Sequence, residues 1–214
     1  MKKKRKSLEW DLGQLDSFDN PKIALEQYST STQLTADILL TASQADHVEN
    51  RWVADLGCGC GQLAIGAALL GANRVTGFDV DSEALSICAH NVETSDVTDL
   101  IDLVQIDICS LSVCDRFVNA FDTVIMNPPF GTKKSEGIDM LFVRMALRLA
   151  PVVYSLHKTS TRQFIQRSAA SLNARVEVLA ELRFDLPATY KFHRKHSVDV
   201  QVDLIRFVRN TAVT

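Results

Sequence analysis

Short apolar runs rich in β-branched residues alternate with segments of helical periodicity through the middle of this 214-residue chain. The strand-like runs cover 52–56, 74–78, 101–106, 121–126 and 152–156. The segments with helical spacing cover 62–70, 82–93, 137–149 and 161–172, and the connection 110–119 fits either interpretation. Strands that alternate with helices form βαβ units around a parallel sheet, and such strands are buried on both faces. The alternation therefore predicts an α/β fold.

The end of the chain departs from this alternation, because 175–183 and 197–207 are strand-like with no helical segment between them. From Val198 to Leu204 apolar and polar residues alternate, a period of two that is typical of a strand. Two strands joined by a loop predict an antiparallel hairpin that closes one side of the sheet. Five parallel strands followed by a hairpin give a seven-stranded, mostly parallel sheet. At the level of fold this resembles the Rossmann-like class I methyltransferases.

The residues before the first strand are predicted to add two helices. Apolar residues recur at helical spacing within 3–15 and again within 34–42, where Thr30 or Ser31 would cap the second helix. We expect residues 1–50 to form a helical segment and residues 51–214 the Rossmann-like domain, within one globular unit.

The composition, 46% hydrophobic and 23% charged, is that of an ordinary globular protein. No run approaches the roughly 20 apolar residues of a membrane span. The basic start, 1–6, is followed by no apolar core, which argues against a secretory signal and fits a nuclear address, a nucleic-acid tether or a solvated tail. The five cysteines include no C-x-x-C pair, which predicts no metal site and a reducing compartment. A net charge of −3 argues against an overall nucleic-acid coat but leaves room for a local basic patch.

A glycine-rich turn, Asp55-Leu-Gly-Cys-Gly-Cys-Gly61, follows the first predicted strand and begins a helix. Glycines at 57, 59 and 61 would let the backbone pass close beneath a ligand, and the helix N-terminus offers free N–H groups. The dinucleotide fingerprint G-x-G-x-x-G has its third glycine one position later. The spacing therefore favours S-adenosylmethionine over a nicotinamide dinucleotide, the alternative being a purely structural turn.

Acidic residues follow the next two strands. Asp79 ends the second, where a carboxylate would accept the ribose hydroxyls of an adenosyl group. Asp107 ends the third, placed to meet the adenine amino group, and Ile108 would pack on the ring. Asp81 and Glu83 fit the first turn of a helix, where the dipole favours them. Because ligands of open α/β sheets bind at the carboxyl edge, these positions support the same cofactor.

Asn127-Pro128-Pro129-Phe130 follows the fourth strand, again at the carboxyl edge. The two prolines stiffen the backbone and remove two donors, which leaves carbonyls as acceptors in a fixed direction. If the Asn127 side-chain oxygen and the Pro128 carbonyl each accept one N–H, a planar amino nitrogen gains electron density toward the methyl donor. Phe130 would stack on a planar substrate, or else is an ordinary core phenylalanine. We therefore predict amino-group methylation with these four residues as the catalytic loop.

Several motifs together resemble the eukaryotic methyltransferase-like protein 5 family, the small-subunit (18S) rRNA adenosine-N6 methyltransferases, from about Phe18 to Val208. They are Leu25-Glu-Gln-Tyr28, Val53-Ala-Asp-Leu-Gly-Cys-Gly-Cys-Gly61, Phe121-Asp-Thr-Val-Ile-Met-Asn-Pro-Pro-Phe-Gly-Thr-Lys133, Tyr154-Ser-Leu-His-Lys158, Asp185-Leu-Pro187 and Tyr190-Lys-Phe-His193. The resemblance implies formation of N6-methyladenosine in small-subunit ribosomal RNA.

The resemblance also implies further site residues and a partner. Gln27 and Thr30 would belong to a lid over the cofactor, and Gly57, Cys60 and Gln62 to the cofactor loop. The family works with a small zinc-binding activator subunit. We expect a heterodimer through the sheet edge at 101–106, because unpaired edges accept added strands. A ribosomal RNA substrate implies the nucleus (nucleolus) and cytoplasm.

A basic and aromatic cluster, 190–196, lies in the loop of the predicted hairpin. Its cations could neutralise phosphates, and its aromatic rings could stack on unpaired bases. The alternative is a solvated loop with Tyr190 and Phe192 turned inward. The predicted RNA-binding residues are Lys133, Lys134, Lys191, His193, Arg194 and Lys195.

Three other functions fit parts of the pattern. A side-chain amide is also a planar amino group, so a protein glutamine methyltransferase is an alternative, although the basic loop favours nucleic acid. DNA adenine methylation is disfavoured because 214 residues leave no room for a separate target-recognition domain. An inactive cofactor-binding scaffold subunit would have no need of the Asn127–Phe130 loop.

Overall fold

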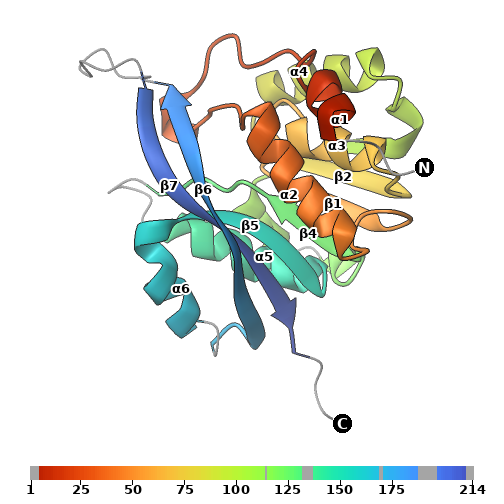
Figure 1. Ribbon diagram of the computed structural model, residues 1–214. Coiled ribbons are helices and arrows are strands. Elements are labelled where there is room, and N and C mark those ends of the chain that lie inside the picture. Colours follow the sequence, from red (N-terminus) through yellow and green to blue (C-terminus); the bar gives the residue numbers. More distant parts are fainter. Residues whose placement is uncertain (1–4, 114, 132–136, 169–170, 188–196, 211–214) are drawn as a thin grey trace.

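The computed structural model describes residues 5–113, 115–131, 137–168, 171–187 and 197–210 (Figure 1). Its centre is a seven-stranded sheet with the order β3-β2-β1-β4-β5-β7-β6. The parallel strands are β1 (Trp52–Leu56), β2 (Arg74–Asp79), β3 (Ile101–Gln105), β4 (Thr123–Met126) and β5 (Val152–Lys158). The predicted α/β fold with five parallel strands is confirmed, and β3 is the predicted edge strand.

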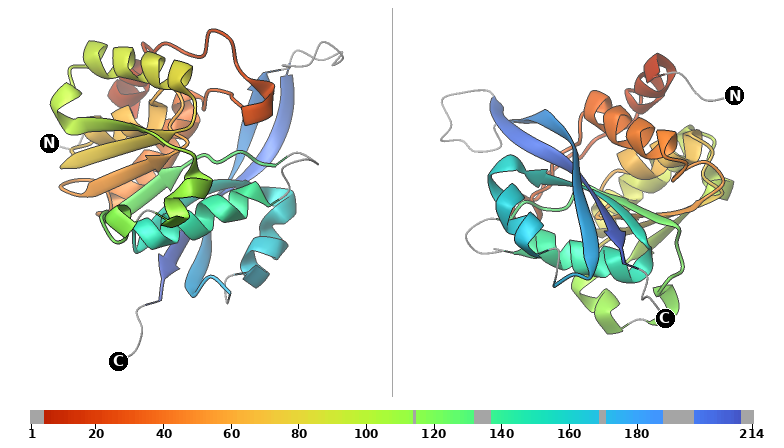
Figure 2. Two further views of the ribbon diagram at one scale, coloured as in Figure 1. Left: turned by 180° about the vertical axis from the view of Figure 1, so that it is seen from behind. Right: turned by 60° about the horizontal axis from the view of Figure 1, so that its bottom comes forward.

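The two remaining strands form the predicted antiparallel hairpin. β6 (Ala174–Pro187) pairs with β7 (Ser197–Arg209), and β7 pairs antiparallel with β5. The hairpin is long and strongly twisted, and it spans nearly the full height of the molecule in Figures 1 and 2. A register shift between Val178 and Ala180 interrupts its pairing.

Helices cover both faces of the sheet, as Figures 1 and 2 show. One face carries α1 (Arg5–Leu12), α2 (Thr32–Gln44), α3 (Gln62–Leu69) and α4 (Ser82–Thr94). The other carries α5 (Ile138–Leu149) and α6 (Arg162–Ser168). Short 3-10 turns connect these elements: η1 (Ile23–Leu25), η2 (Thr98–Leu100), η3 (Ile108–Val113), η4 (Asp115–Phe117) and η5 (Thr159–Thr161). Among the described residues, no helix has the length and apolar character that crossing a membrane requires.

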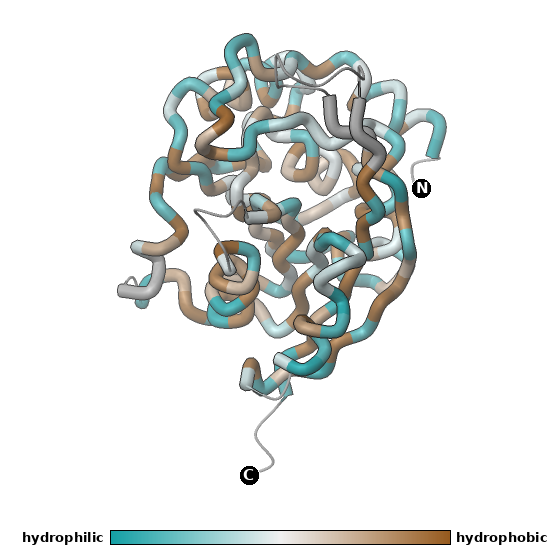
Figure 3. The backbone as a smooth tube through the Cα atoms, turned by 90° about the vertical axis from the view of Figure 1, so that its left-hand side faces the viewer, coloured by the Kyte–Doolittle hydropathy of each residue, from teal (hydrophilic) through white to brown (hydrophobic). Residues whose placement is uncertain are grey.

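Each helical layer has its own apolar core against the sheet. Leu8, Leu12 and Leu39 are fully buried in the first, and Phe207 is fully buried in the second. Apolar and polar residues alternate along the outer helices in Figure 3, as expected for helices with one face on a sheet. The α2 cap is Ser31, one of the two predicted, whose side chain accepts the Leu34 N–H.

Several element boundaries differ from the predicted ones, and three of them have a local cause or bear on the site. β4 begins at Thr123 instead of residue 121, because the Asp122 side chain accepts the Trp52 N–H at 2.8 Å and ends the loop there. α6 begins at Arg162 instead of residue 161, because Thr159–Thr161 forms the 3-10 turn η5. β3 ends at Gln105, so the predicted site residue Asp107 follows the strand instead of ending it.

Candidate active site

The glycine-rich turn after β1 is tied to the end of β2. The N–H groups of Gly57 and Cys58 both donate to the Phe78 carbonyl, at 2.8 and 3.0 Å. The Gly59 N–H donates to Asp79 Oδ2 at 2.8 Å. Asp79 therefore shapes the turn, in addition to the predicted role in which it faces the ligand.

Two positions in this turn require glycine. Gly59 has a φ of 53°, and a Cβ there would lie 2.9 Å from Cζ of Phe18. Gly61 has a φ of 93°, and its Cβ would lie 2.6 Å from Sγ of Cys88. Side chains rarely adopt this left-handed conformation, and neither site has space for one. The turn can therefore approach the Phe18 ring closely.

Two buried carboxylates stand beneath the turn. Asp55 Oδ2 accepts the Ala64 N–H at 3.0 Å, and Asp79 Oδ1 accepts the Asp81 N–H at 2.9 Å. Burial raises the pKa of Asp55 to about 8. Burial also raises the pKa of Asp79, although hydrogen bonds from three backbone N–H groups oppose the shift. A ligand that donates hydrogen bonds here, as a ribose does, would favour the charged forms.

The segment 18–30, called the lid below, is fastened to Asp81. Lys22 Nζ lies 2.6 Å from Asp81 Oδ1, and Gln27 Nε2 donates to Asp81 Oδ2 at 2.6 Å. Asp81 is the N-cap of α4 and accepts the Glu83 N–H, so it precedes the first turn in which the sequence placed it. Burial opposes its ionisation, but the hydrogen bonds from Lys22 and Gln27 outweigh burial and lower its pKa.

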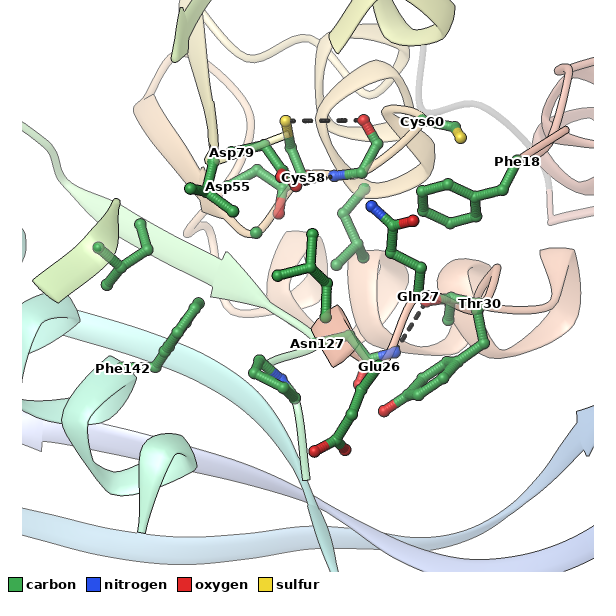
Figure 4. Close-up of a pocket in the computed structure, with 18 of the residues that line it drawn as sticks. Phe18, Glu26, Gln27, Thr30, Asp55, Cys58, Cys60, Asp79, Asn127 and Phe142 are labelled. Carbon is green, nitrogen blue, oxygen red and sulfur yellow. Dashed lines mark hydrogen bonds between the residues drawn. The ribbon is translucent and has the colours of Figure 1, made fainter. Parts of the chain in front are cut away.

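A cavity of about 320 Å³ lies between the lid and the carboxyl edge of the sheet. Pockets for small molecules usually start at about this volume. Figure 4 shows the carboxylates of Asp55 and Asp79 near one end and Asn127 toward the other. The predicted cofactor residues that line the cavity are Gln27, Thr30, Asp55, Gly57, Gly59, Cys60, Gln62, Asp79, Asp107, Ile108 and Asn127. Gly61, also predicted, caps α3 and does not line it.

Aromatic residues that the sequence did not single out complete the wall. Phe18 comes from the lid and Phe142 from α5, and they lie on opposing sides of the cavity in Figure 4. A Cβ on Gly57 would lie 3.3 Å from Phe142 Cε1, so this ring packs directly against the turn. Its place in an apolar helical stripe marks Phe142 only as a core residue, which is why sequence reasoning missed it.

Two predicted cofactor residues, Gln27 and Gln62, make side-chain hydrogen bonds within the protein. Gln27 donates to Asp81, and its Oε1 accepts the Lys22 N–H at 2.8 Å, so it holds the lid closed. Gln62 Nε2 donates to the Leu12 carbonyl at 3.3 Å, while its Oε1 is buried without a partner among the described residues.

Cys60 and Asp107 differ in exposure. The Cys60 thiol is nearly buried, and desolvation raises its pKa to about 12, so it stays neutral at physiological pH. Asp107 is exposed, and its carboxylate accepts the Cys109 N–H at 2.9 Å. Ile108 beside it is buried and presents an apolar surface to the cavity. Among the described residues, no group of three or more His, Cys, Asp and Glu side chains could hold a metal ion.

The Asn127 amide is oriented by the lid. Its Nδ2 donates to Thr30 Oγ1 at 2.9 Å, as the dashed line in Figure 4 shows. Its Oδ1 is buried and has no hydrogen-bond partner among the described residues. A buried acceptor without a partner is costly, and in a cavity wall it points to a donor supplied by a ligand.

The rest of the catalytic loop is divided between the cavity and the core. Pro129 lines the cavity, whereas Pro128 and Phe130 do not. The Phe130 ring is 8% exposed and packs against Tyr28 and Phe184, with centroid distances of 5.8 and 6.3 Å. In this conformation Phe130 is a core residue at the edge of the site, and a stacking role requires one of its neighbours to move.

The predicted RNA-binding residues lie outside the described part of the chain. They are Lys133 and Lys134 after the catalytic loop and Lys191, His193, Arg194 and Lys195 in the hairpin loop. Their role stays a prediction.

Comparison with known proteins agrees with this site. Residues 29–150 match the family described as methyltransferase small domain. Over 206 residues the chain is 54% identical to the rRNA N(6)-adenosine-methyltransferase METTL5 of Danio rerio, covering 95% of this chain and 98% of that protein. It is 46% identical to Mettl5 of Drosophila melanogaster, covering 95% and 96%.

A solved structure has the same fold over its whole length. It is a Pyrococcus horikoshii protein provisionally assigned as an RNA methyltransferase, 33% identical with a TM-score of 0.86. The match covers 99% of this chain and 100% of that one. Because identity to the METTL5 proteins extends over nearly the whole chain, this protein belongs to the METTL5 family of rRNA N6-adenosine methyltransferases.

Proposed function

We propose that this protein transfers a methyl group from S-adenosylmethionine to the N6 amino group of an adenosine in small-subunit ribosomal RNA. Family membership supports an rRNA N6-adenosine methyltransferase. The observation that carries the chemistry is the unpaired, buried Oδ1 of Asn127, held at the cavity wall by Thr30.

The cavity suits S-adenosylmethionine in shape and in donor set. The glycine turn and Phe18 both line the cavity, and a Cβ at Gly59 would lie 2.9 Å from the Phe18 ring, so only glycine lets the two approach so closely. Asp79 offers a buried carboxylate for ribose hydroxyls, and Asp107 with Ile108 offers an acceptor and an apolar surface for adenine. When bound, this cofactor supplies a methyl group activated by a positively charged sulfur.

The catalytic loop activates the amino group by accepting its protons in hydrogen bonds. Asn127 Oδ1 accepts one N–H, and the Pro128 carbonyl accepts the second. These bonds hold the nitrogen in one orientation and return electron density to it. With the cofactor bound, Asn127 and Pro128 would hold the amino nitrogen toward the methyl donor, and a proton of the amino group would leave to solvent. The loop therefore needs no strong base.

We also propose that a small zinc-binding activator subunit adds to the edge strand β3. This strand pairs only with β2 among the described strands and is partly exposed. An exposed edge accepts a strand from a partner. A ribosomal RNA substrate would place the complex in the nucleolus and cytoplasm.

The test is methyl transfer from labelled S-adenosylmethionine, with the chain assayed alone and with the activator subunit. Small-subunit rRNA, DNA and a peptide release factor are offered in parallel. We expect label as N6-methyladenosine in rRNA and a loss of about a hundredfold or more in Asn127→Ala, as for other preorganised polar groups in active sites. Asn73→Ala is the matched control, because Asn73 is an exposed residue of the turn before β2.

Each other result contradicts a separate part of the proposal. Label on protein or DNA would retain the chemistry and reject the substrate. An Asn127→Ala variant as active as Asn73→Ala would reject the role of the amide. Tight S-adenosylhomocysteine binding with no transfer to any substrate would favour a scaffold subunit.

A further inference from the structure

Lys158, the last residue of β5, places an ammonium group against the catalytic loop. Its Nζ lies over the ring of Phe130, 5.7 Å from the centroid. The side chain is half-buried, and no hydrogen bond or ion pair with another described residue engages the ammonium group. The cation is therefore held chiefly by the ring, an interaction that an anionic ligand can replace.

The backbone that carries Lys158 is firmly held. In the sheet, Lys158 pairs with Val202 of β7. The preceding residue, His157, is fully buried, and its Nδ1 lies 3.2 Å from Oδ2 of Asp139 at the start of α5. Movement at this position is therefore confined to the lysine side chain.

The Phe130 ring can receive a planar base only if one of its neighbours moves. It is 8% exposed, with Tyr28, Phe184 and Lys158 around it. Phe184 is 1% exposed and fixed in the core, and Tyr28, a partly buried residue of the lid, packs edge-on against it at 5.2 Å between centroids. Lys158 has a long, flexible side chain and is the neighbour that can leave.

We propose that Lys158 binds a phosphate of the nucleotide whose base enters the catalytic loop, and that the base takes its place beside Phe130. This inference rests on the proposed function and extends it to how the site recognises a nucleotide. Lysine is a common point-charge ligand of phosphate. Stacking of a base on an aromatic ring is generally stronger than an exposed cation–π contact, so the exchange is favourable. A peptide amide brings neither phosphate nor base, and Lys158 would therefore favour RNA over protein.

The test compares RNA binding by the wild-type chain and Lys158→Met, both saturated with S-adenosylhomocysteine, over a range of salt concentrations. Methionine keeps the packing against the ring and removes the charge. The probe is a single-stranded rRNA fragment that the wild-type chain methylates. We expect roughly tenfold weaker binding at low salt, and a slope of log affinity against log salt that is smaller by about 0.7, the value of one phosphate contact. Lys158→Arg should retain the wild-type slope.

Arg116→Met is the matched control. This exposed arginine of η4 precedes β4 and so lies toward the amino ends of the strands, whereas Lys158 lies at the carboxyl end of β5. Arg116→Met removes the same charge and should leave the slope unchanged. A Lys158→Met variant with the slope and affinity of Arg116→Met would overturn the proposal. So would a loss of S-adenosylhomocysteine affinity or of melting temperature in Lys158→Met, since either marks a structural role. A wild-type chain that methylates no RNA would overturn the proposed function, and this inference with it.

Discussion

Replacing Gly59 by alanine would test the contact between the glycine turn and the lid. At a φ of 53°, alanine costs about 1–2 kcal/mol relative to an ordinary conformation. The added Cβ would also lie 2.9 Å from Phe18 Cζ, so the Phe18 ring and the lid must shift. Overpacking of this kind costs about 1–3 kcal/mol. At about 1.36 kcal/mol for each factor of ten, it corresponds to a loss of about 5- to 150-fold in cofactor affinity.

Gly71→Ala separates the two effects. Gly71 has a φ of 90°, and a Cβ there would have Glu49 Cγ as its nearest neighbour, at an ordinary contact distance of 3.5 Å. This turn lies before β2, at the edge of the sheet opposite to the cavity. Both variants should melt about 2–8 °C below wild type, because alanine is strained at the positive φ of either position. Only Gly59→Ala should lose S-adenosylhomocysteine affinity in calorimetry.

Two results would refute this reasoning. Wild-type affinity in Gly59→Ala, with a melting temperature lowered as in Gly71→Ala, would mean that Phe18 does not close the cavity. An equal loss of affinity in both variants would mean that binding follows global stability instead of the position of the lid.

Three further predictions concern the lid, the cofactor pocket and the hairpin. Lys22→Met removes the ion pair between the lid and Asp81, so S-adenosylhomocysteine should dissociate a few-fold faster in stopped-flow measurements. Dissociation at the wild-type rate would show that this ion pair does not hold the lid in place. Burial raises the pKa of Asp55 to about 8. Between about pH 4 and 8 the folded chain therefore keeps a proton on Asp55 that the unfolded chain releases. The contribution of this group to the free energy of unfolding falls as the pH rises. The difference in unfolding free energy between Asp55→Asn and wild type should therefore move in favour of the variant from pH 5 to pH 8, whereas parallel pH profiles would count against this. Arg162→Met leaves the fully buried Asp203 without its ion pair and should lower the melting temperature by about 5–10 °C. Asp203→Asn should lower the melting temperature less, because the unpaired Arg162 is partly exposed to water. A larger decrease in Asp203→Asn than in Arg162→Met would disprove the argument.

The fold follows closely from local patterns because parallel strands buried on both faces leave a continuous apolar signal. The predicted bounds of β1, Trp52–Leu56, match the structure. The hairpin was predictable because Val198–Leu204 alternates with a period of two. The start of β4 was not predictable, because the hydrogen bond between Trp52 and Asp122 joins residues 70 apart in the chain.

In the candidate site, too, local sequence patterns locate some residues but not the distant residues that they contact. Asp79 and Asn127 could be located because their place after a strand fixes the edge of the sheet at which they lie. Their partners could not be predicted, because Thr30 is 97 residues from Asn127 in the chain. Gln27 shows the same limit, since the family resemblance assigned it to the cofactor lid, while in the structure its two polar ends bond to Lys22 and Asp81.

Through these distant contacts the lid supports the loop Asn127–Phe130 in addition to covering the cavity. Thr30 supplies the hydrogen bond that orients the Asn127 amide, and Tyr28 packs against the Phe130 ring. Displacing the lid would open the cavity and also remove the partner of the Asn127 Nδ2. The Oδ1 acceptor that we propose for the amino group would thus keep its orientation only while the lid stays in this position. In the proposed mechanism, cofactor enclosure and substrate activation would therefore depend on the same short segment of the chain.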